Sequence, residues 1–432
     1  MRGWMRVAMM ASLVGAAVLS ACGGGSSSSS GKANLRLLNA SPAYPSLDLQ
    51  AAGVAVDTGV AYGTVGAYAA VGDTSVATVV NNTGSTTGLS TATRSLTKDV
   101  NWTLVTYGSL GALKTALIRE DVVAPAAGLT SLMLLNYAPD AGAVDIYLTG
   151  STDTDLTSFT PIATVAAGSG VGYLSVASGT YRLWVTGTGD RTDLRLDKQG
   201  LVLGSAQVDS LVITEGAGGM LVNSVLVQQQ GTATALTNTM ARVRVVSATS
   251  DRGSVTVNVA GTPVVSSVAS PEIGAYTLVT ASTQAPVTAS VNGTALAVAN
   301  QSLAFGGDYT MLVWGSAGAP KFSMIADDNR YPTVSTNAKI RLVNATSGPS
   351  NSLTLLADLS PVANNVAQGA GSAYASVLAN NQMQLNVSSA TVASIYSSGT
   401  NGTPVLAKGL YTVFMLGDSG APVAQVRKDR VN

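Results

Sequence analysis

The sequence predicts an all-β protein made of four tandem Ig-like antiparallel β-sandwich domains. Val, Thr, Gly, Ser and Ala dominate the composition, and glutamate occurs only three times in 432 residues. β-Branched residues suit a pleated surface, and Gly suits turns. Apolar and polar residues alternate in segments such as 254–259 and 384–387, which is typical of half-buried strands. A fourfold internal repeat is the third observation that predicts this fold.

Residues 1–21 are predicted to be a signal peptide. Arg2 and Arg6 precede an uncharged, mostly apolar run at 7–19, which is too short to span a bilayer. The following Leu-Ser-Ala-Cys at 19–22 resembles the lipobox of bacterial lipoproteins, whose cysteine is acylated and becomes the first mature residue. That resemblance implies lipidation of Cys22. Gly23 in place of Asp implies transfer to the outer membrane, on its periplasmic or its surface face.

Residues 22–32 are expected to form the lipidated cysteine and a flexible tether. A Gly/Ser-rich run occupies 23–31, and such a coil spans about 15–18 Å from end to end. The membrane, reached through acylated Cys22, is therefore an expected partner. Farther along, every apolar stretch is soon broken by Thr, Ser, Asn or Gly, so no transmembrane helix is predicted there.

Charge argues against a nucleic-acid partner. Lys plus Arg and Asp plus Glu both number 23, and removal of the signal peptide leaves the mature chain slightly acidic. A protein that binds a polyanion needs a positive field, and this balance provides none.

The repeat defines the domain organisation. A strand that ends in a polar turn recurs four times, at 35–42, 132–139, 243–250 and 340–347. The copies start about 100 residues apart, which is the size of one β-sandwich. The predicted domains are 33–125, 126–231, 232–332 and 333–432, of which the second is the most divergent. Four tyrosines keep the register of the repeat and are expected at equivalent places: Tyr68, Tyr173, Tyr276 and Tyr374.

A known family matches these patterns. The opening at Arg36–Pro42, the strands that contain Asp48 and Asp145, and the strand at 309–313 resemble the bacterial lipoprotein repeats called domain of unknown function 4397. The resemblance covers essentially all of 33–432 in four copies. It implies an Ig-like sandwich on an envelope lipoprotein, and it supplies neither an activity nor site residues.

Several chemistries are excluded by absence. The chain has no histidine, so it cannot build a Ser-His-Asp or Cys-His arrangement or an imidazole-based zinc or copper site. Its single cysteine, Cys22, cannot form an intramolecular disulfide. No cofactor and no metal site are predicted. Four aspartates in loops of the second copy offer oxygen ligands to calcium, although such residues are usually solvated: Asp153, Asp155, Asp190 and Asp193.

Charged residues recur with the repeat at two positions. Copies one, three and four carry Arg36, Arg244 and Arg341 three residues before the turn residue, where copy two has Met133. Asp121, Asp328 and Asp429 follow the strand-end glycine, where copy two has Gln229. Joint loss of both charges suggests that they pair, since an isolated buried charge is costly. The predicted pairs, between adjacent first and last strands, are Arg36–Asp121, Arg244–Asp328 (or Asp327) and Arg341–Asp429. Chance placement of ordinary surface charges is the alternative.

Two function classes follow from the sequence. The favoured one is a non-catalytic, lipid-anchored envelope protein, a rod of sandwiches that acts as a binding, adhesion or spacer module toward an envelope protein or glycan. The alternative is a hydrolase that uses carboxylates alone, for example on a glycan. A cleft that holds two facing carboxylates would favour the enzyme.

Overall fold

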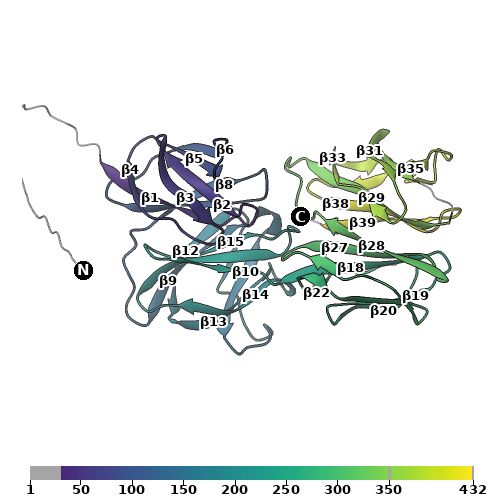
Figure 1. Cartoon of the computed structure of the whole chain (residues 1–432), viewed down its shortest axis with the longest axis horizontal. Helices are drawn as coiled ribbons and strands as arrows, with labels where there is room; N and C mark the ends of the chain where they lie inside the picture. Colours follow the sequence, from purple (N-terminus) through teal and green to yellow (C-terminus); the bar gives the residue numbers. More distant parts are fainter. Residues whose placement is uncertain (1–30, 349–351, 431–432) are drawn as a thin grey trace, which may run out of the picture.

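The computed structural model describes residues 31–348 and 352–430 and consists almost entirely of β-strands (Figure 1). Over these residues there is no α-helix, and the one helical element is a 3-10 turn, η1 (Pro139–Ala141). Across the same ranges, no helix is long and apolar enough to cross a membrane. The strands form pairs of facing sheets around four separate apolar cores. The predicted all-β sandwich fold is therefore confirmed.

Sandwich 1 consists of two four-stranded sheets. One has the order β4 (Ala69–Gly72), β1 (Lys32–Asn39), β7 (Asn101–Tyr107), β8 (Lys114–Arg119). The other has the order β3 (Val54–Ala61), β2 (Ser46–Ala51), β5 (Val76–Asn82), β6 (Gly88–Arg94). Burial follows the alternation of the sequence, because Leu47, Leu49 and Ala51 of β2 face the core and alternate with partly exposed polar residues.

Sandwich 2 extends beyond its predicted end at Gly231. One sheet has the order β11 (Ala163–Val165), β10 (Val144–Gly150), β13 (Gly179–Gly187), β14 (Asp190–Leu203). The other has the order β12 (Ser169–Ala177), β9 (Leu129–Tyr137), β15 (Gln207–Glu215), β16 (Val222–Gln228), β17 (Ala233–Leu236). Since β17 pairs with β16 and Leu236 joins the core, the boundary lies after residue 236. Gly231 lies in the turn between β16 and β17, so a domain boundary placed at this glycine leaves β17 outside the sandwich.

Sandwiches 3 and 4 share one plan. In sandwich 3, β21 (Glu272–Ile273) and β22 (Thr277–Thr280) both pair with one edge of β18 (Met240–Thr249), and β27 (Asp308–Ser316) and β28 (Ala319–Asp327) follow on its other side. Its second sheet is β20 (Thr262–Ala269), β19 (Ser254–Val259), β24 (Val287–Val291), β25 (Thr294–Leu296), with β23 (Ser282–Ala285) paired to β26 (Gln301–Leu303).

In sandwich 4, β32 (Ala370–Gly371) and β33 (Ala375–Leu378) both pair with one edge of β29 (Asn337–Ser347), and β38 (Leu410–Asp418) and β39 (Val423–Arg430) follow on its other side. The second sheet is β31 (Ser360–Val366), β30 (Leu353–Ala357), β35 (Leu385–Ser389), β36 (Tyr396–Ser397). A short ribbon joins β34 (Asn380–Met383) to β37 (Thr403–Val405). The sandwiches thus carry more strands than the roughly seven of a simple Ig-like domain.

In sandwiches 1, 3 and 4 the first strand lies beside the penultimate strand, and the last strand is one place farther out. In sandwich 2 the first strand lies beside β15, and β16 and β17 lie farther out. β1 pairs in parallel with β7, β9 with β15, β18 with β27, and β29 with β38. The predicted adjacency of first and last strands is therefore wrong. In sandwiches 1, 3 and 4 the last two strands form a hairpin whose first arm lies beside the first strand, and in sandwich 2 the corresponding hairpin is β15 and β16.

The sandwiches are arranged as two face-to-face pairs, with sandwiches 1 and 2 in one half and 3 and 4 in the other (Figure 1). An apolar layer separates the sheets of sandwiches 1 and 2, and it includes Leu38, Val105, Leu135 and Val212. A second layer joins sandwiches 3 and 4 and includes Val246, Leu312, Val343 and Phe414. The expected single-file rod does not form, because these sheets are apolar on both faces and need cover on both.

Candidate functional site

In sandwich 1 the recurring arginine lies in a buried polar cluster. The Nη2 atom of Arg36 is 3.0 Å from Oε1 of Glu120, and its Nε donates to the hydroxyl of Thr103 at 2.8 Å. The guanidinium carbon lies 4.5 Å from the centre of the Tyr68 ring, whose hydroxyl donates to Glu120. These groups satisfy one another away from water, so the cluster fixes the geometry of two adjoining strands.

The same cluster also joins sandwich 1 to sandwich 2. Arg36 donates to the carbonyl oxygen of Gly231 at 2.5 Å, and the backbone N–H of Gln230 donates to Glu120 at 2.8 Å. Both acceptor and donor belong to the turn between β16 and β17. The ion pair therefore has contacts on both sides of the interface between the sandwiches.

In sandwiches 3 and 4, each repeat arginine pairs with the acid of the other sandwich. Arg341 of sandwich 4 lies 2.6 Å from Asp327 of sandwich 3, and Arg244 of sandwich 3 is paired with Asp429 of sandwich 4. All four side chains are buried. Each partner comes from the equivalent position of the other sandwich, so the interface is reciprocal, as in a two-fold symmetric dimer.

The repeat tyrosines complete these clusters. The Tyr276 hydroxyl donates to Asp327 at 2.6 Å, and the Tyr374 hydroxyl donates to Asp429 at 2.9 Å. Burial raises the pKa of Tyr276, with a further contribution from the Asp327 charge, so its hydroxyl stays protonated and remains a donor. Tyr68, Tyr276 and Tyr374 thus occupy equivalent places, as predicted. The fourth repeat tyrosine, Tyr173, lies at the register shift of β12 beside β9, in the sandwich that has Met133 in place of the arginine.

The predicted ion-pair partners are wrong in all three copies. Asp121 instead pairs with exposed Arg119 at 2.5 Å, and Asp328 pairs with Arg330 at 2.6 Å and with Lys339 at 2.8 Å. The acids that do pair with the repeat arginines are Glu120, Asp327 and Asp429. All three follow their strand-end glycine by twelve residues. A fixed spacing of twelve residues after the glycine identifies all three acids. The prediction instead used the aspartates at 121 and 328, which lie one residue farther along.

Sandwich 2 lacks this cluster. Met133 stands opposite Ser210 in the register that places Arg36 opposite Thr103. Gln229 takes the acid's place and exchanges two hydrogen bonds with the backbone of Val122, at 2.8 and 3.0 Å. Loss of both charges therefore leaves no unpaired ion in this interface.

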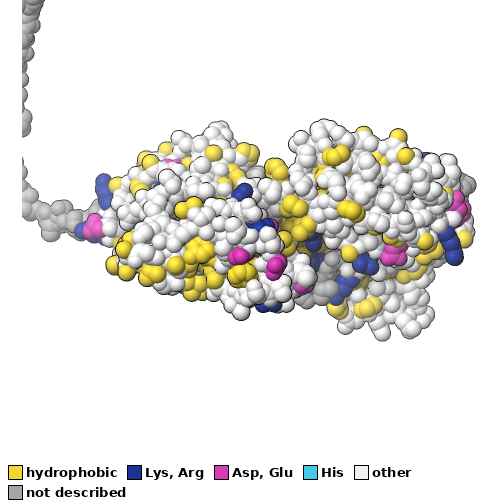
Figure 2. Space-filling model, turned by 90° about the horizontal axis from the view of Figure 1, so that it is seen from below, with side chains coloured by type: hydrophobic (Ala, Val, Ile, Leu, Met, Phe, Trp, Pro, Cys, Tyr) yellow, Lys and Arg dark blue, Asp and Glu magenta, His cyan; other side chains and the backbone are white. Residues whose placement is uncertain are grey.

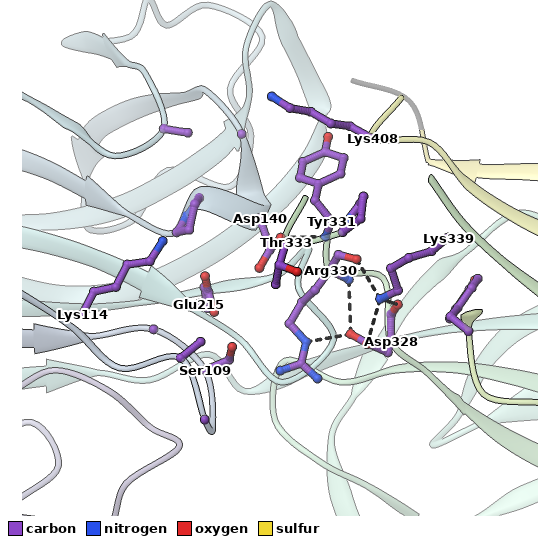
Figure 3. A pocket seen from close by; sticks show the side chains of 18 of the residues that line it. Ser109, Lys114, Asp140, Glu215, Asp328, Arg330, Tyr331, Thr333, Lys339 and Lys408 are labelled. Carbon is purple, nitrogen blue, oxygen red and sulfur yellow. Dashed lines mark hydrogen bonds and ion pairs between the residues drawn. The ribbon is translucent and has the colours of Figure 1, made fainter. Parts of the chain in front are cut away.

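A cleft of about 900 Å³, whose lining includes several charged side chains, lies where the two halves of the molecule meet (Figure 3). Its walls come from 108–114 of sandwich 1, from 139–143 and Glu215 of sandwich 2, from 328–333 between sandwiches 3 and 4, and from sandwich 4. Charged side chains gather at this junction, whereas much of the adjoining surface is uncharged (Figure 2). The volume is that of an ordinary small-molecule or peptide site.

Two carboxyl groups face each other in the cleft. Glu215, at the end of β15, is only 6% exposed, and its Oε2 atom has no hydrogen-bond partner. Burial raises the pKa of Glu215 to about 7, and the neighbouring Asp140 carboxylate adds to the shift. Asp140, in η1, accepts a hydrogen bond from the backbone N–H of Tyr331 at 2.7 Å. Near neutral pH this pair of carboxyl groups can therefore hold one proton between them.

The opposite wall carries cations. Figure 3 shows Glu215 and Lys114 on one side of the cleft, with Arg330, Asp328 and Lys339 on the other. Although burial by itself raises the pKa of Asp328, hydrogen bonds from Lys339 and Arg330 hold that pKa below its ordinary value. Asp328 therefore remains ionised and is fully engaged by its two neighbours.

Backbone contacts fix the two halves of the cleft to each other. The loop after β15 donates from the N–H of Gly218 to the carbonyl of Gly306 at 2.8 Å, and the N–H of Asn329 donates to the carbonyl of Gly218 at 3.1 Å. A Cβ on Gly219, which has φ of +90°, would lie 2.9 Å from the backbone nitrogen of Arg330. Only glycine permits this close approach.

The remaining predicted sites give no further cluster. In residues 31–348 and 352–430, no three acidic, histidine or cysteine side chains come together as a metal site. Asp193 pairs with Arg195 at 2.5 Å, and Asp155 and Asp190 accept bonds from their own loops. Cys22 lies outside the described residues.

The chain is a β-sandwich protein of several domains, and segments of three of its sandwiches line the cleft. The model of the family "Domain of unknown function (DUF4397)" matches residues 33–147 and 241–351, more than half of the chain. The chain belongs to this family.

Solved structures match this chain at a low level, and the Bacillus anthracis TIE protein is one of them. The Bacillus anthracis TIE protein is 11% identical, with a TM-score of 0.14 over 86% of this chain. This chain spans 66% of the length of that one. Such a score supports no structural argument. A search of curated proteins finds no match.

Proposed function

We propose that this chain is a lipid-anchored protein of the bacterial cell envelope that acts as a non-catalytic binding module and holds its ligand in the cleft between the two halves. The observation that carries the proposal is the composition of the cleft. Segments far apart in the sequence, 108–114, 139–143 and 328–333, meet around one cavity. A spacer with no ligand needs no such meeting point of charged side chains.

The buried clusters support this role because they keep the walls in place. Arg36 ties sandwich 1 to sandwich 2, and the exchanged pairs of Arg244 and Arg341 tie sandwich 3 to sandwich 4. A ligand then meets a site that is already formed, and little entropy is lost in ordering it.

The lipobox at Cys22 supplies the anchor in this proposal. β1 begins at Lys32, at the outer end of the half formed by sandwiches 1 and 2, whereas β39 ends near the middle of the molecule (Figure 1). A tether of about 15–18 Å from lipid to β1 places sandwich 1 near the membrane. The cleft then lies farther from the lipid, where it is open to ligands of the envelope.

Hydrogen exchange of the mature protein in detergent tests the proposed function. Separate fractions of envelope peptides, glycans and proteins are added, and we expect one of them to slow exchange at 108–114, 139–143 and 328–333. The double variant Glu215→Gln, Lys114→Gln should lose this protection. The proposal fails if no fraction protects the cleft, or if protection appears only at loops outside it.

The carboxylate hydrolase remains a second candidate because of one observation, the facing carboxyl groups of Asp140 and Glu215. A pair that holds one proton resembles the dyad of aspartic proteases. Hydrolysis of chromogenic peptides or glycosides that disappears in Glu215→Gln would establish the enzyme. We propose that no such turnover occurs.

A further inference from the structure

The outer edge of β8 has no strand partner. β8 ends the order β4-β1-β7-β8, and in the part of the chain that the structure describes it pairs only with β7. The N–H of Glu120 donates to the carbonyl of Asn101 in the continuation of that pairing. Hydrogen-bonded and non-hydrogen-bonded residues alternate along an antiparallel pair, so the backbone groups of Thr115, Leu117 and Arg119 point away from β7. Over the described residues, no other segment bonds to those backbone groups.

The equivalent strand of sandwich 2 has a partner along its outer edge. β16 follows β15 as β8 follows β7, and β17 pairs antiparallel with β16. The N–H of Gln228 donates to the carbonyl of Thr232, where β17 approaches. Ala233 of β17 lies opposite Val227, and both contribute to the apolar layer between sandwiches 1 and 2. A strand therefore extends the pair of sandwiches at the edge of β16 and not at the equivalent edge of β8.

An apolar pocket of about 270 Å³ lies beside this free edge. Both sandwiches contribute apolar and aromatic side chains to its lining, among them Leu117, Ile118, Val122, Met133, Leu135 and Tyr173. Met133 and Tyr173 are partly exposed, so the pocket is accessible from solvent. In sandwiches 1, 3 and 4 an arginine takes the place of Met133 and lies over the equivalent tyrosine. The shorter side chain of Met133 leaves that space open.

The rim of the pocket carries no free charge. Arg119 and Asp121, which also line it, pair with each other at 2.5 Å. A ligand for this pocket therefore needs no charge, and a neutral apolar group fits its lining. β17 consists of four residues, and a strand of that length with one buried side chain is smaller than the interface of a stable dimer. It suits a short extended segment of another protein.

We propose that β8 is a docking edge for an extended segment of a partner protein, which adds as an antiparallel strand and places one apolar side chain in the pocket. This site is separate from the cleft of the proposed function. Backbone hydrogen bonds to Thr115 and Leu117 supply affinity, and the pocket supplies selectivity.

The register of β17 indicates which residue of the segment enters the pocket. Val227 and Ile118 hold equivalent positions, because they lie opposite Ser210 and Thr103 in their hairpins. The residue of the partner opposite Ile118 then takes the place that Ala233 has beside β16, and it faces sandwich 2. A volume of about 270 Å³ accepts a side chain larger than that of alanine, such as leucine.

Peptide titration followed by nuclear magnetic resonance tests the proposal on the full chain with Cys22→Ser, which has no acyl chain to occupy the pocket. The probe is an acetylated and amidated peptide with the sequence of residues 232–237, in which leucine replaces the residue equivalent to Ala233. We expect it to slow the exchange of the amides of Thr115 and Leu117, whereas the amides of β8 that bond to β7 are already protected. The same peptide with alanine retained should bind at least about tenfold more weakly, because it buries less apolar area. N-methylation of its third residue, which blocks the pairing with Leu117, should weaken binding of the leucine probe about tenfold.

Substitutions in the protein separate the pocket from the strand edge. Met133→Phe fills the pocket and should reduce binding of the leucine probe to the level of the alanine peptide. Thr115→Pro removes an outward N–H and leaves the bonds to β7 in place, because edge strands tolerate proline at such positions. It should weaken both peptides about tenfold. Val202→Phe, at a 61% exposed position of β14 in sandwich 2, is the matched control and should bind like the wild type.

The docking proposal is overturned if the leucine probe leaves exchange at Thr115 and Leu117 unchanged, or if the alanine peptide binds as well as the leucine probe. Equal binding of the N-methylated probe would show that the pocket takes a side chain without strand pairing, and it would also overturn the proposal. If both amides become protected without peptide as the protein concentration rises, the edge belongs to a second copy of this chain, and the assignment to a partner protein is wrong.

Discussion

The ion pairs that join sandwiches 3 and 4 allow a quantitative prediction of how substitutions change the stability of this interface. Arg341 is 1% exposed and Asp327 is fully buried, and 2.6 Å separates their charged atoms. The variants are Arg341→Met, Asp327→Asn and the double variant. Removal of one member of a buried pair typically destabilises by about 3–5 kcal/mol, because it leaves the other charge uncompensated.

The double variant should cost much less than the sum. Arg341→Met also loses the hydrogen bond from its Nε atom to Thr412 at 2.9 Å, so we expect about 4 kcal/mol. Asp327→Asn keeps an oxygen acceptor for Tyr276 and Thr310, so we expect about 3 kcal/mol. Together they should cost about 4 kcal/mol, which gives a coupling energy of about 3 kcal/mol.

Hydrogen exchange at β29 and β38 measures the free energy of opening this pair of sandwiches. The control cycle uses the exposed pair of Arg119 and Asp121, which are 50% and 39% exposed, and its coupling should stay below about 1 kcal/mol. If the Arg341 and Asp327 costs add to within about 0.5 kcal/mol, the pair does not bridge the sandwiches and the reasoning is refuted.

Three further predictions follow from single residues. Asp209 is 1% exposed, neither of its carboxyl oxygens has a hydrogen-bond partner, and burial raises its pKa to about 6. As the pH rises from 4 to 8, the wild type should lose about 3 kcal/mol of stability relative to Asp209→Asn, because the buried carboxyl group must ionise. Urea titrations in which the difference in unfolding free energy between the two proteins does not change with pH would contradict this. Gly219→Ala should speed hydrogen exchange at 328–331, whereas Gly168→Ala, whose Cβ meets nothing within 4 Å, should leave that segment unchanged. Cys22→Ser should release the protein from membranes in a carbonate wash, because no acyl chains then anchor it; retention on the membrane would show that Cys22 is not the anchor.

The cleft depends on residues that no motif connects. Lys114 is the first residue of β8, Glu215 is the last residue of β15, and Arg330 follows β28, so the three come from different parts of the chain. None of them belongs to a repeated position. They become neighbours only because the loop at Gly219 docks on the segment that contains Arg330.

The sequence by itself determined the features that depend on local periodicity and on the repeat. Alternation of side chains predicts strands, and the spacing of the copies predicts sandwiches with Tyr68, Tyr276 and Tyr374 at equivalent places. Joint loss of charge at Met133 and Gln229 correctly indicated that the recurring arginines have acidic partners.

Only the tertiary structure decided which acid meets which arginine. Equivalent positions in two copies carry the same residues, so pairing within one sandwich and pairing across two sandwiches have the same sequence pattern. When sandwiches 3 and 4 pack face to face, the reciprocal interface brings Arg341 to Asp327 and Arg244 to Asp429. Packing of two apolar sheet faces sets that arrangement, and it involves long-range contacts that periodicity along the chain does not encode.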